Sequence, residues 1–177
     1  MNYFELYELP VTFTPDPAVV KQKFYELSKK YHPDFYINES PEKQAEVLEL
    51  STLNNKAYNV LSDSQKRLQY ILELNGLIAE GENYVLPPTF LMSMMEINEV
   101  LMDLQFDPDE AKLEQVKANV SEIEQDMAAE LEVLTSSFER LVPEAQQAVL
   151  VSIKDLYYRN KYLLRIRETL GKVSPLS

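Results

Sequence analysis

The sequence predicts an all-α protein, with an N-terminal helical hairpin accompanied by short helices and a C-terminal antiparallel three-helix bundle. The chain has 177 residues but only three glycines, and its abundant Leu, Glu and Lys favour helix over strand. Apolar residues recur at helical spacing along most of the chain, and no segment alternates in the manner of a half-buried strand. Prolines directly follow capping residues at several points, which is typical of helix starts.

Two long helices are predicted to form the N-terminal hairpin. The first is capped by Asp16 and is expected to end at Tyr31, because Pro33 disfavours helical backbone in the residue before it. The second is capped by Ser40 and runs to about Leu61. Since one short loop joins them, they should pack antiparallel. Their contact is expected through two apolar stripes, which consist of Val20, Phe24, Leu27 and Tyr31, and of Val47, Leu50, Leu53, Ala57 and Leu61.

Two short helices flank the hairpin. Asn2 and Glu5 have the spacing of a capping box, which predicts a helix that ends near Leu9 and Pro10. Ser62 and Gln65 have the same spacing, which predicts a further helix ending at Gly76. Its buried side is expected to consist of Leu68, Ile71 and Leu72.

The chain is predicted to divide into a first domain at 1–76, a linker at 77–87 and a three-helix bundle at 88–177. The linker segment contains Gly81 and Pro87 and shows no convincing hydrophobic period. Beyond it, proline and acidic residues mark three helix starts, at Pro87-Pro88, at Asp107-Pro108 and at Pro143-Glu144, and the last helix is expected to end before Gly171. Short turns between these helices favour an antiparallel bundle.

Composition excludes several classes of function. The chain has no cysteine, so disulfides, thiol redox chemistry and cysteine-ligated metal centres are excluded. With a single histidine, a protein-only metal site is not expected, although carboxylate sites for hard cations stay open, and no cofactor is predicted. Net charge is −12, with −3 on residues 1–76 and −9 on residues 77–177, which disfavours nucleic acid and anionic membranes as partners. No signal-like or membrane-spanning segment is found, so a cytoplasmic location is expected.

The tripeptide His32-Pro33-Asp34 stands at the break between the two hairpin helices. Asp34 is expected to hold the turn through its side chain, with the only histidine beside it. The preceding stretch is basic, because Lys21, Lys23, Lys29 and Lys30 face only Glu26. On its own, this basic stretch favours an ordinary solvated helix face, with lysines near the C-terminal end of the helix where the dipole favours cations.

Residues 1–76 resemble a J-domain. The resemblance rests on Tyr3-Phe4-Glu5-Leu6, on Lys30-Tyr31-His32-Pro33-Asp34, and on the run from Asn55 to Asp63 followed by Lys66-Arg67 and Tyr70. It implies binding to a DnaK-type chaperone of the 70-kDa heat-shock class and stimulation of its ATP hydrolysis. The residues expected to contact that chaperone are His32, Pro33, Asp34, Lys21, Tyr25 and Lys29. Phe35, where many J-domains carry lysine, and Glu26 leave the identity of the chaperone open.

The whole chain is similar to the HscB family of co-chaperones in iron–sulfur cluster assembly. The quoted residues are Phe90-Leu91-Met92 with Met95, Glu96 and Glu99, and Gln69 to Leu74 after Lys66-Arg67. In that family a J-domain is joined directly to an acidic three-helix bundle that binds the cluster scaffold IscU. The similarity therefore implies IscU and an HscA-type chaperone as partners.

The first bundle helix has more apolar surface than one core face requires. Phe90, Met94, Ile97, Leu101 and Leu104 form one arc, assigned to the core. Outside it lie an apolar strip, defined as Leu91, Met92, Met95 and Met102, and a carboxylate row, defined as Glu96, Glu99 and Asp103. From periodicity alone, a wide core covered by a neighbouring helix is equally consistent with the strip. The HscB resemblance favours scaffold binding through Leu91, Met92, Met95, Glu96, Glu99 and Asp103, completed by Tyr158.

Three hypotheses follow. The first is an adaptor that brings the scaffold to an HscA-type chaperone. The alternative is a J-protein that serves a general DnaK-type chaperone with another client. A third, enzymatic hypothesis uses His32 and Asp34 as a catalytic pair. It is disfavoured because the loop offers no nucleophile, no glycine-rich phosphate loop and no evident pocket.

Overall fold

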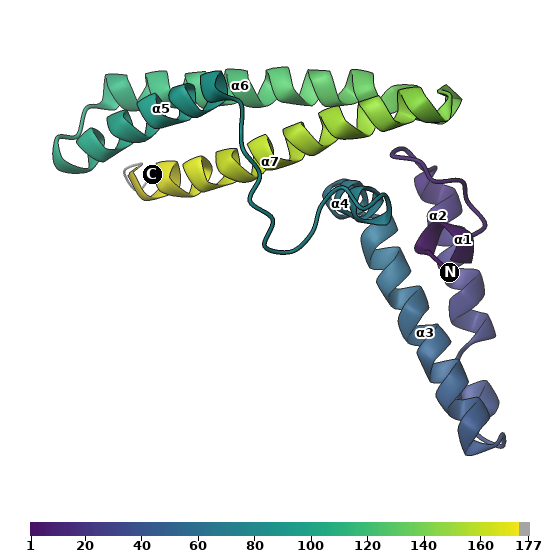
Figure 1. Cartoon of the computed structure of the whole chain (residues 1–177). Coiled ribbons are helices and arrows are strands. Elements are labelled where there is room, and N and C mark those ends of the chain that lie inside the picture. Colours follow the sequence, from purple (N-terminus) through teal and green to yellow (C-terminus); the bar gives the residue numbers. More distant parts are fainter. Residues whose placement is uncertain (174–177) are drawn as a thin grey trace. The chain divides into compact units, whose positions relative to one another are not determined.

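The chain, whose residues 1–173 are described by a computed structural model, folds into two helical units (Figure 1). The first unit comprises Met1–Gly76 together with Phe138–Arg140, and the second comprises Leu77–Ser137 and the chain from Leu141 onward. The helices are α1 (Tyr3–Leu6), α2 (Pro17–Lys30), η1 (Pro33–Tyr36), α3 (Pro41–Leu61), α4 (Ser64–Leu74), α5 (Pro88–Phe106), α6 (Glu110–Ser136), η2 (Phe138–Arg140) and α7 (Pro143–Val173). None of the described helices is long and apolar enough to cross a bilayer.

The hairpin of the first unit is formed by α2 and α3, which lie side by side in Figure 1. Its helices begin as their caps predict: the Asp16 carboxylate accepts a hydrogen bond from the N–H of Ala18, and the Ser40 hydroxyl accepts one from Lys43. The predicted stripes face inward. Val20, Val47, Ala57 and Leu61 are fully buried, and Phe24, Leu27, Tyr31, Leu50 and Leu53 are half-buried.

A buried asparagine ties three segments of the first unit together. Asn54 on α3 is 1% exposed. Its side-chain oxygen accepts a hydrogen bond from the Tyr7 hydroxyl at 2.8 Å. Its amide nitrogen donates to the Phe24 carbonyl and to the Ser28 hydroxyl of α2, both at 3.1 Å. Burial also raises the pKa of Tyr7 well above its usual value, so the phenol stays a hydrogen-bond donor.

Replacing Asn54 with alanine is expected to lower the free energy of unfolding by about 2 kcal/mol, because the side-chain hydrogen bonds to Tyr7, Phe24 and Ser28 are lost together. The Tyr7 hydroxyl keeps only its longer bond, at 3.2 Å, to the backbone carbonyl of residue 54. Equilibrium denaturation in urea, followed by circular dichroism, measures the change. The adjacent Asn55 is exposed, so Asn55→Ala is the control and should change the free energy by less than about 0.5 kcal/mol. A midpoint for Asn54→Ala equal to that of the wild type would contradict this role of the network.

The second unit is a bundle of α5, α6 and α7 (Figure 1). The arc predicted for α5 is confirmed, since Phe90, Met94, Ile97, Leu101 and Leu104 are all buried. They pack in one cluster with residues of the other two helices, namely Leu113, Val116 and Val120 of α6 and Leu163, Ile166 and Leu170 of α7. The bundle thereby fixes which side of α5 faces away from the core.

Four predicted helix boundaries are wrong. Helix α1 ends at Leu6, with Tyr7 as its C-cap, before the predicted end near Leu9 and Pro10. Ser62 is the C-cap of α3 rather than the N-cap of α4, and Asp63 caps α4 by accepting hydrogen bonds from the N–H groups of Gln65 and Lys66. Asp107 ends α5, while Asp109 caps α6, because Pro108 stands between the last helical turn and the next start. Gly171 does not end α7, which continues to Val173, because a glycine weakens a helix without breaking it.

Candidate functional site

The tripeptide forms a short, ordered turn rather than an open loop. As predicted, α2 ends just before it, at Lys30. His32 then caps the 3₁₀ helix η1: its Nδ1 atom accepts a hydrogen bond from the backbone N–H of Asp34 at 3.3 Å. The expectation that the Asp34 side chain holds the turn is therefore wrong, because the imidazole does so. The His32 and Asp34 side chains remain 54% and 83% exposed, available to a partner.

The turn is anchored on both sides. The Tyr36 hydroxyl donates to the carbonyl of Lys30 at 2.7 Å. The Gln44 side chain, at the start of α3, donates to the carbonyls of Ile37 and Glu39 at 3.2 and 3.0 Å. Because helix ends on either side hold it, the turn presents its exposed side chains in a defined arrangement.

One exposed face of α2 carries the other residues predicted to contact a chaperone. Lys21, Tyr25 and Lys29 are all exposed and line one shallow depression with Ala18, Gln22 and Glu26. The Lys21 Nζ atom lies 5.9 Å from the centre of the Tyr25 ring, within the range of a cation–π contact. Within the described part of the chain, neither lysine forms an ion pair, so both charges face solvent.

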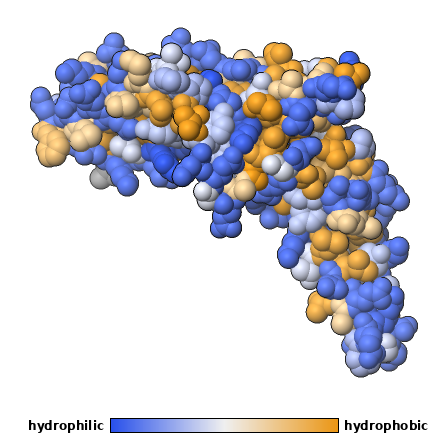
Figure 2. Space-filling view, viewed as in Figure 1, coloured by the Kyte–Doolittle hydropathy of each residue, from blue (hydrophilic) through white to orange (hydrophobic). Residues whose placement is uncertain are grey.

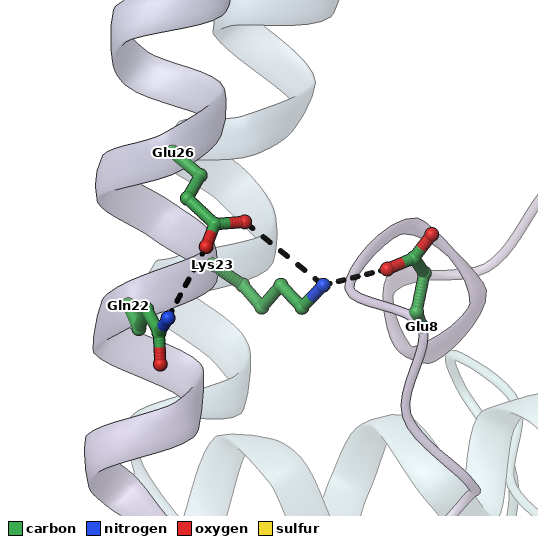
Figure 3. Close-up of polar contacts among 4 residues, drawn as sticks. All are labelled: Glu8, Gln22, Lys23 and Glu26. Atoms are coloured by element: carbon green, nitrogen blue, oxygen red, sulfur yellow. Dashed lines mark hydrogen bonds and ion pairs between the residues drawn. The ribbon is translucent and has the colours of Figure 1, made fainter.

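Lys23 does not belong to this free basic face. Figure 3 shows its Nζ atom between two carboxylates, 2.6 Å from Glu8 and 3.9 Å from Glu26. The hydrogen bond from Lys23 lowers the pKa of Glu8, and the same bond raises the pKa of Lys23, so both stay charged at neutral pH. Gln22 also donates to Glu26 at 3.3 Å. The positive charge offered to a partner is therefore smaller than the sequence alone indicates.

The apolar strip of α5 is exposed, which contradicts the alternative of a wide, covered core. Met92, Met95 and Met102 are 62%, 64% and 61% exposed, while Leu91 is half-buried at the edge of the bundle. Figure 2 shows apolar patches that interrupt the otherwise largely hydrophilic surface along this helix. Such a row of exposed methionines is typical of protein-binding surfaces, because the flexible thioether adapts to a partner.

The carboxylate row accompanies the strip on the same outward side. Glu96, Glu99 and Asp103 are exposed. Among residues 1–173, none of the three forms an ion pair. A surface of methionines beside unpaired carboxylates favours a partner that offers apolar groups next to basic ones.

Tyr158 of α7 is held by the segment that the sequence predicts to be a linker. Its ring stacks on Tyr84 at 4.5 Å, and its hydroxyl donates to Glu82 at 2.7 Å. Lys154 also pairs with Glu82 at 2.7 Å. Burial and the hydrogen bond to Glu82 raise the pKa of Tyr158 to about 12. One ring face and the hydroxyl are thus engaged within the bundle unit, and no hydrogen bond or ring contact joins Tyr158 to α5 in the described chain.

Sequence reasoning missed this clasp, which consists of Glu82, Tyr84, Lys154, Asp155 and Tyr158. The Tyr84 hydroxyl donates to Asp155 at 2.6 Å, and burial and this bond raise the pKa of Tyr84 to about 12. The only available signal was an aromatic residue inside a segment without hydrophobic period.

Known families match both units. The DnaJ domain matches residues 2–70, and the HscB C-terminal oligomerisation domain matches residues 86–171. A curated co-chaperone protein HscB homolog of Vibrio vulnificus strain YJ016 is 34% identical over 134 residues, which are 75% of this chain and 78% of the relative. The homolog of Shewanella baltica is 27% identical over 174 residues, which are 98% and 97% of the two chains.

Two solved structures are similar over nearly the whole chain. The chaperone HscB from Vibrio cholerae has a TM-score of 0.64 at 26% identity, with 98% of this chain and 97% of that chain covered. The human co-chaperone protein HscB has a TM-score of 0.69 at 26% identity, with 97% and 81% covered. The predicted all-α fold of a J-domain followed by a helical bundle is confirmed by these similarities.

Proposed function

Because the chain belongs to the HscB family of J-domain co-chaperones, we propose that it brings an IscU-type iron–sulfur scaffold protein to an HscA- or DnaK-type chaperone. In doing so it stimulates the ATP hydrolysis of that chaperone. A J-domain co-chaperone acts on a partner of the Hsp70 type and is not itself an enzyme. His32 and Asp34 therefore act by contact, and the catalytic-pair hypothesis is set aside.

The observation that carries the proposal is the exposure of the apolar strip beside the carboxylate row. Three exposed methionines on one helix, next to three exposed carboxylates, form a patch that a protein partner can cover. The proposed scaffold-binding residues are Leu91, Met92, Met95, Glu96, Glu99, Asp103 and Tyr158. Tyr158 is half-buried, and its contact with the scaffold is proposed beside its stacking on Tyr84 and its bond to Glu82.

The proposed chaperone contact is the turn and the free basic face of α2, namely His32, Pro33, Asp34, Lys21, Tyr25 and Lys29. A contact that binds the hydrolysis-competent state of the chaperone more tightly than its other states shifts the population toward hydrolysis. Because one chain carries both binding surfaces, it raises the effective concentration of scaffold at the chaperone without any change in either affinity.

Single-turnover ATP hydrolysis by the chaperone tests the proposal. The full-length protein alone should accelerate hydrolysis, and protein plus IscU-type scaffold should accelerate it by more than the product of their separate effects. If the chain served a general chaperone with another client, adding scaffold would change nothing. That result, obtained with both HscA- and DnaK-type chaperones, would overturn the scaffold part of the proposal and leave the J-domain part intact.

A further inference from the structure

A groove runs between α5 and α6 on the side of α5 away from the apolar strip. Its volume is about 870 Å³. The buried side chains of Ile97, Leu104 and Val116 line its floor. Val100 forms part of one wall and is half-buried. The groove therefore has an apolar floor and an apolar wall.

The rim of the groove is strongly acidic. Glu96, Asp103 and Asp107 approach from α5 and the turn that follows it, and Glu122 stands opposite on α6. Lys112 is the single cation among the lining residues. All five side chains are exposed, and across residues 1–173 none of the four carboxylates has an ion-pair partner. The excess negative charge is thus available to a basic ligand.

An exposed aromatic ring marks one end of the groove. Phe106, the last residue of α5, lines the groove and is 87% exposed. An exposed phenyl group beside an apolar floor gives an incoming apolar side chain two surfaces to cover at once. The groove therefore suits a ligand with both basic and apolar groups.

The groove is continuous with the surface proposed to bind the scaffold. Glu96 and Asp103 lie seven residues apart on one side of α5, between the apolar strip and the wall formed by Val100. They therefore belong both to the carboxylate row and to the rim of the groove. A partner that covers the apolar strip and pairs with Glu96 and Asp103 therefore already contacts the rim of the groove.

We propose that the groove is a second part of the scaffold interface and takes a basic segment of the scaffold protein that carries an apolar side chain. This inference rests on the proposed function. The basic groups pair with Glu96, Asp103, Asp107 and Glu122, and the apolar side chain packs on Val100 and Phe106. The interface then extends beyond α5 onto α6, which the apolar strip alone does not require.

Isothermal titration of the full-length protein with the IscU-type scaffold, at low and high salt, tests the groove. Glu122 lies on α6 and outside the carboxylate row, so Glu122→Lys isolates the groove. It should raise the dissociation constant about fivefold to tenfold at low salt, and less at high salt. The control is Glu130→Lys on the same helix, which is exposed and outside the groove and should change affinity less than about twofold. Phe106→Ser tests the apolar contact and should also weaken binding.

The variants separate the two proposals. If Leu91→Ala, Met92→Ala and Met95→Ala combined abolish scaffold binding while Glu122→Lys and Phe106→Ser bind like the wild type, the groove proposal is overturned and the proposed function stands. If the combined alanine variant binds normally, the scaffold-binding strip is overturned, whatever the groove variants do. Equal weakening by Glu122→Lys and Glu130→Lys would show a general charge effect and would also overturn the groove. Thermal melts by circular dichroism confirm that each variant is folded.

Discussion

Replacing His32 with glutamine is expected to abolish stimulation of the chaperone ATPase, with a loss of at least about tenfold, or ~1.4 kcal/mol of activation free energy. The imidazole both caps η1 and stands exposed at the turn. Glutamine removes the ring surface, while the turn keeps its backbone hydrogen bond from Phe35 to the His32 carbonyl and its anchors from Tyr36 and Gln44. Single-turnover ATP hydrolysis by the partner chaperone measures the effect.

The control for His32→Gln is Glu39→Gln, which changes an exposed side chain in the same loop. Glu39 contributes to the turn through its backbone, because its carbonyl accepts a hydrogen bond from Gln44 and its N–H donates one to the Tyr36 carbonyl. Its variant should therefore stimulate hydrolysis as the wild type does. Because both replaced side chains are exposed, neither variant should shift the unfolding midpoint measurably. Full stimulation by His32→Gln would remove His32 from the proposed chaperone contact.

The combined change Leu91→Ala, Met92→Ala and Met95→Ala is expected to raise the dissociation constant for the scaffold about a hundredfold or more. Three apolar side chains that become buried at an interface contribute roughly 1 kcal/mol or more each, or about 3 kcal/mol together. Surface plasmon resonance or isothermal titration with the IscU-type scaffold measures the change. Stability should fall little, because Met92 and Met95 are largely exposed.

A second combined variant in the same unit provides the comparison. Val133, Val151 and Leu164 are 73%, 52% and 56% exposed and lie outside the apolar strip, so their replacement by alanine removes similar apolar area elsewhere. This variant should bind the scaffold as the wild type does. If both combined variants bind equally well, the apolar strip does not form the scaffold contact, and another surface must be sought.

The secondary structure was largely predictable because its signals are local. Asp16, Ser40 and Pro88 mark helix starts through the chemistry of one or two neighbouring residues. The errors arose where two capping residues compete within a few positions, as at Ser62 and Asp63. There the choice depends on which residue leaves the helical conformation first, and that depends on packing rather than on the local pattern.

The partners of individual polar groups were not predictable, because they come from distant parts of the chain. Lys23 was counted as part of a basic face, but its charge is paired with the carboxylate of Glu8, which lies in the segment before α2. Tyr158 was expected to complete a binding patch, and most of its contacts come from Glu82 and Tyr84. Spacing along one helix reveals which residues share a face, but not which loop lies over that face.

The buried Asn54 constrains how this sequence can drift over evolution. Tyr7 and Asn54 satisfy each other's hydrogen-bonding groups although they lie 47 positions apart. A change at Tyr7 leaves the buried side-chain oxygen of Asn54 without its hydrogen bond, whereas after a change at Asn54 the Tyr7 hydroxyl keeps its bond to the backbone carbonyl of residue 54. The coupling between the two positions is therefore one-sided: a lineage that loses the phenol of Tyr7 should also lose the amide of Asn54, whereas a change at Asn54 constrains Tyr7 less.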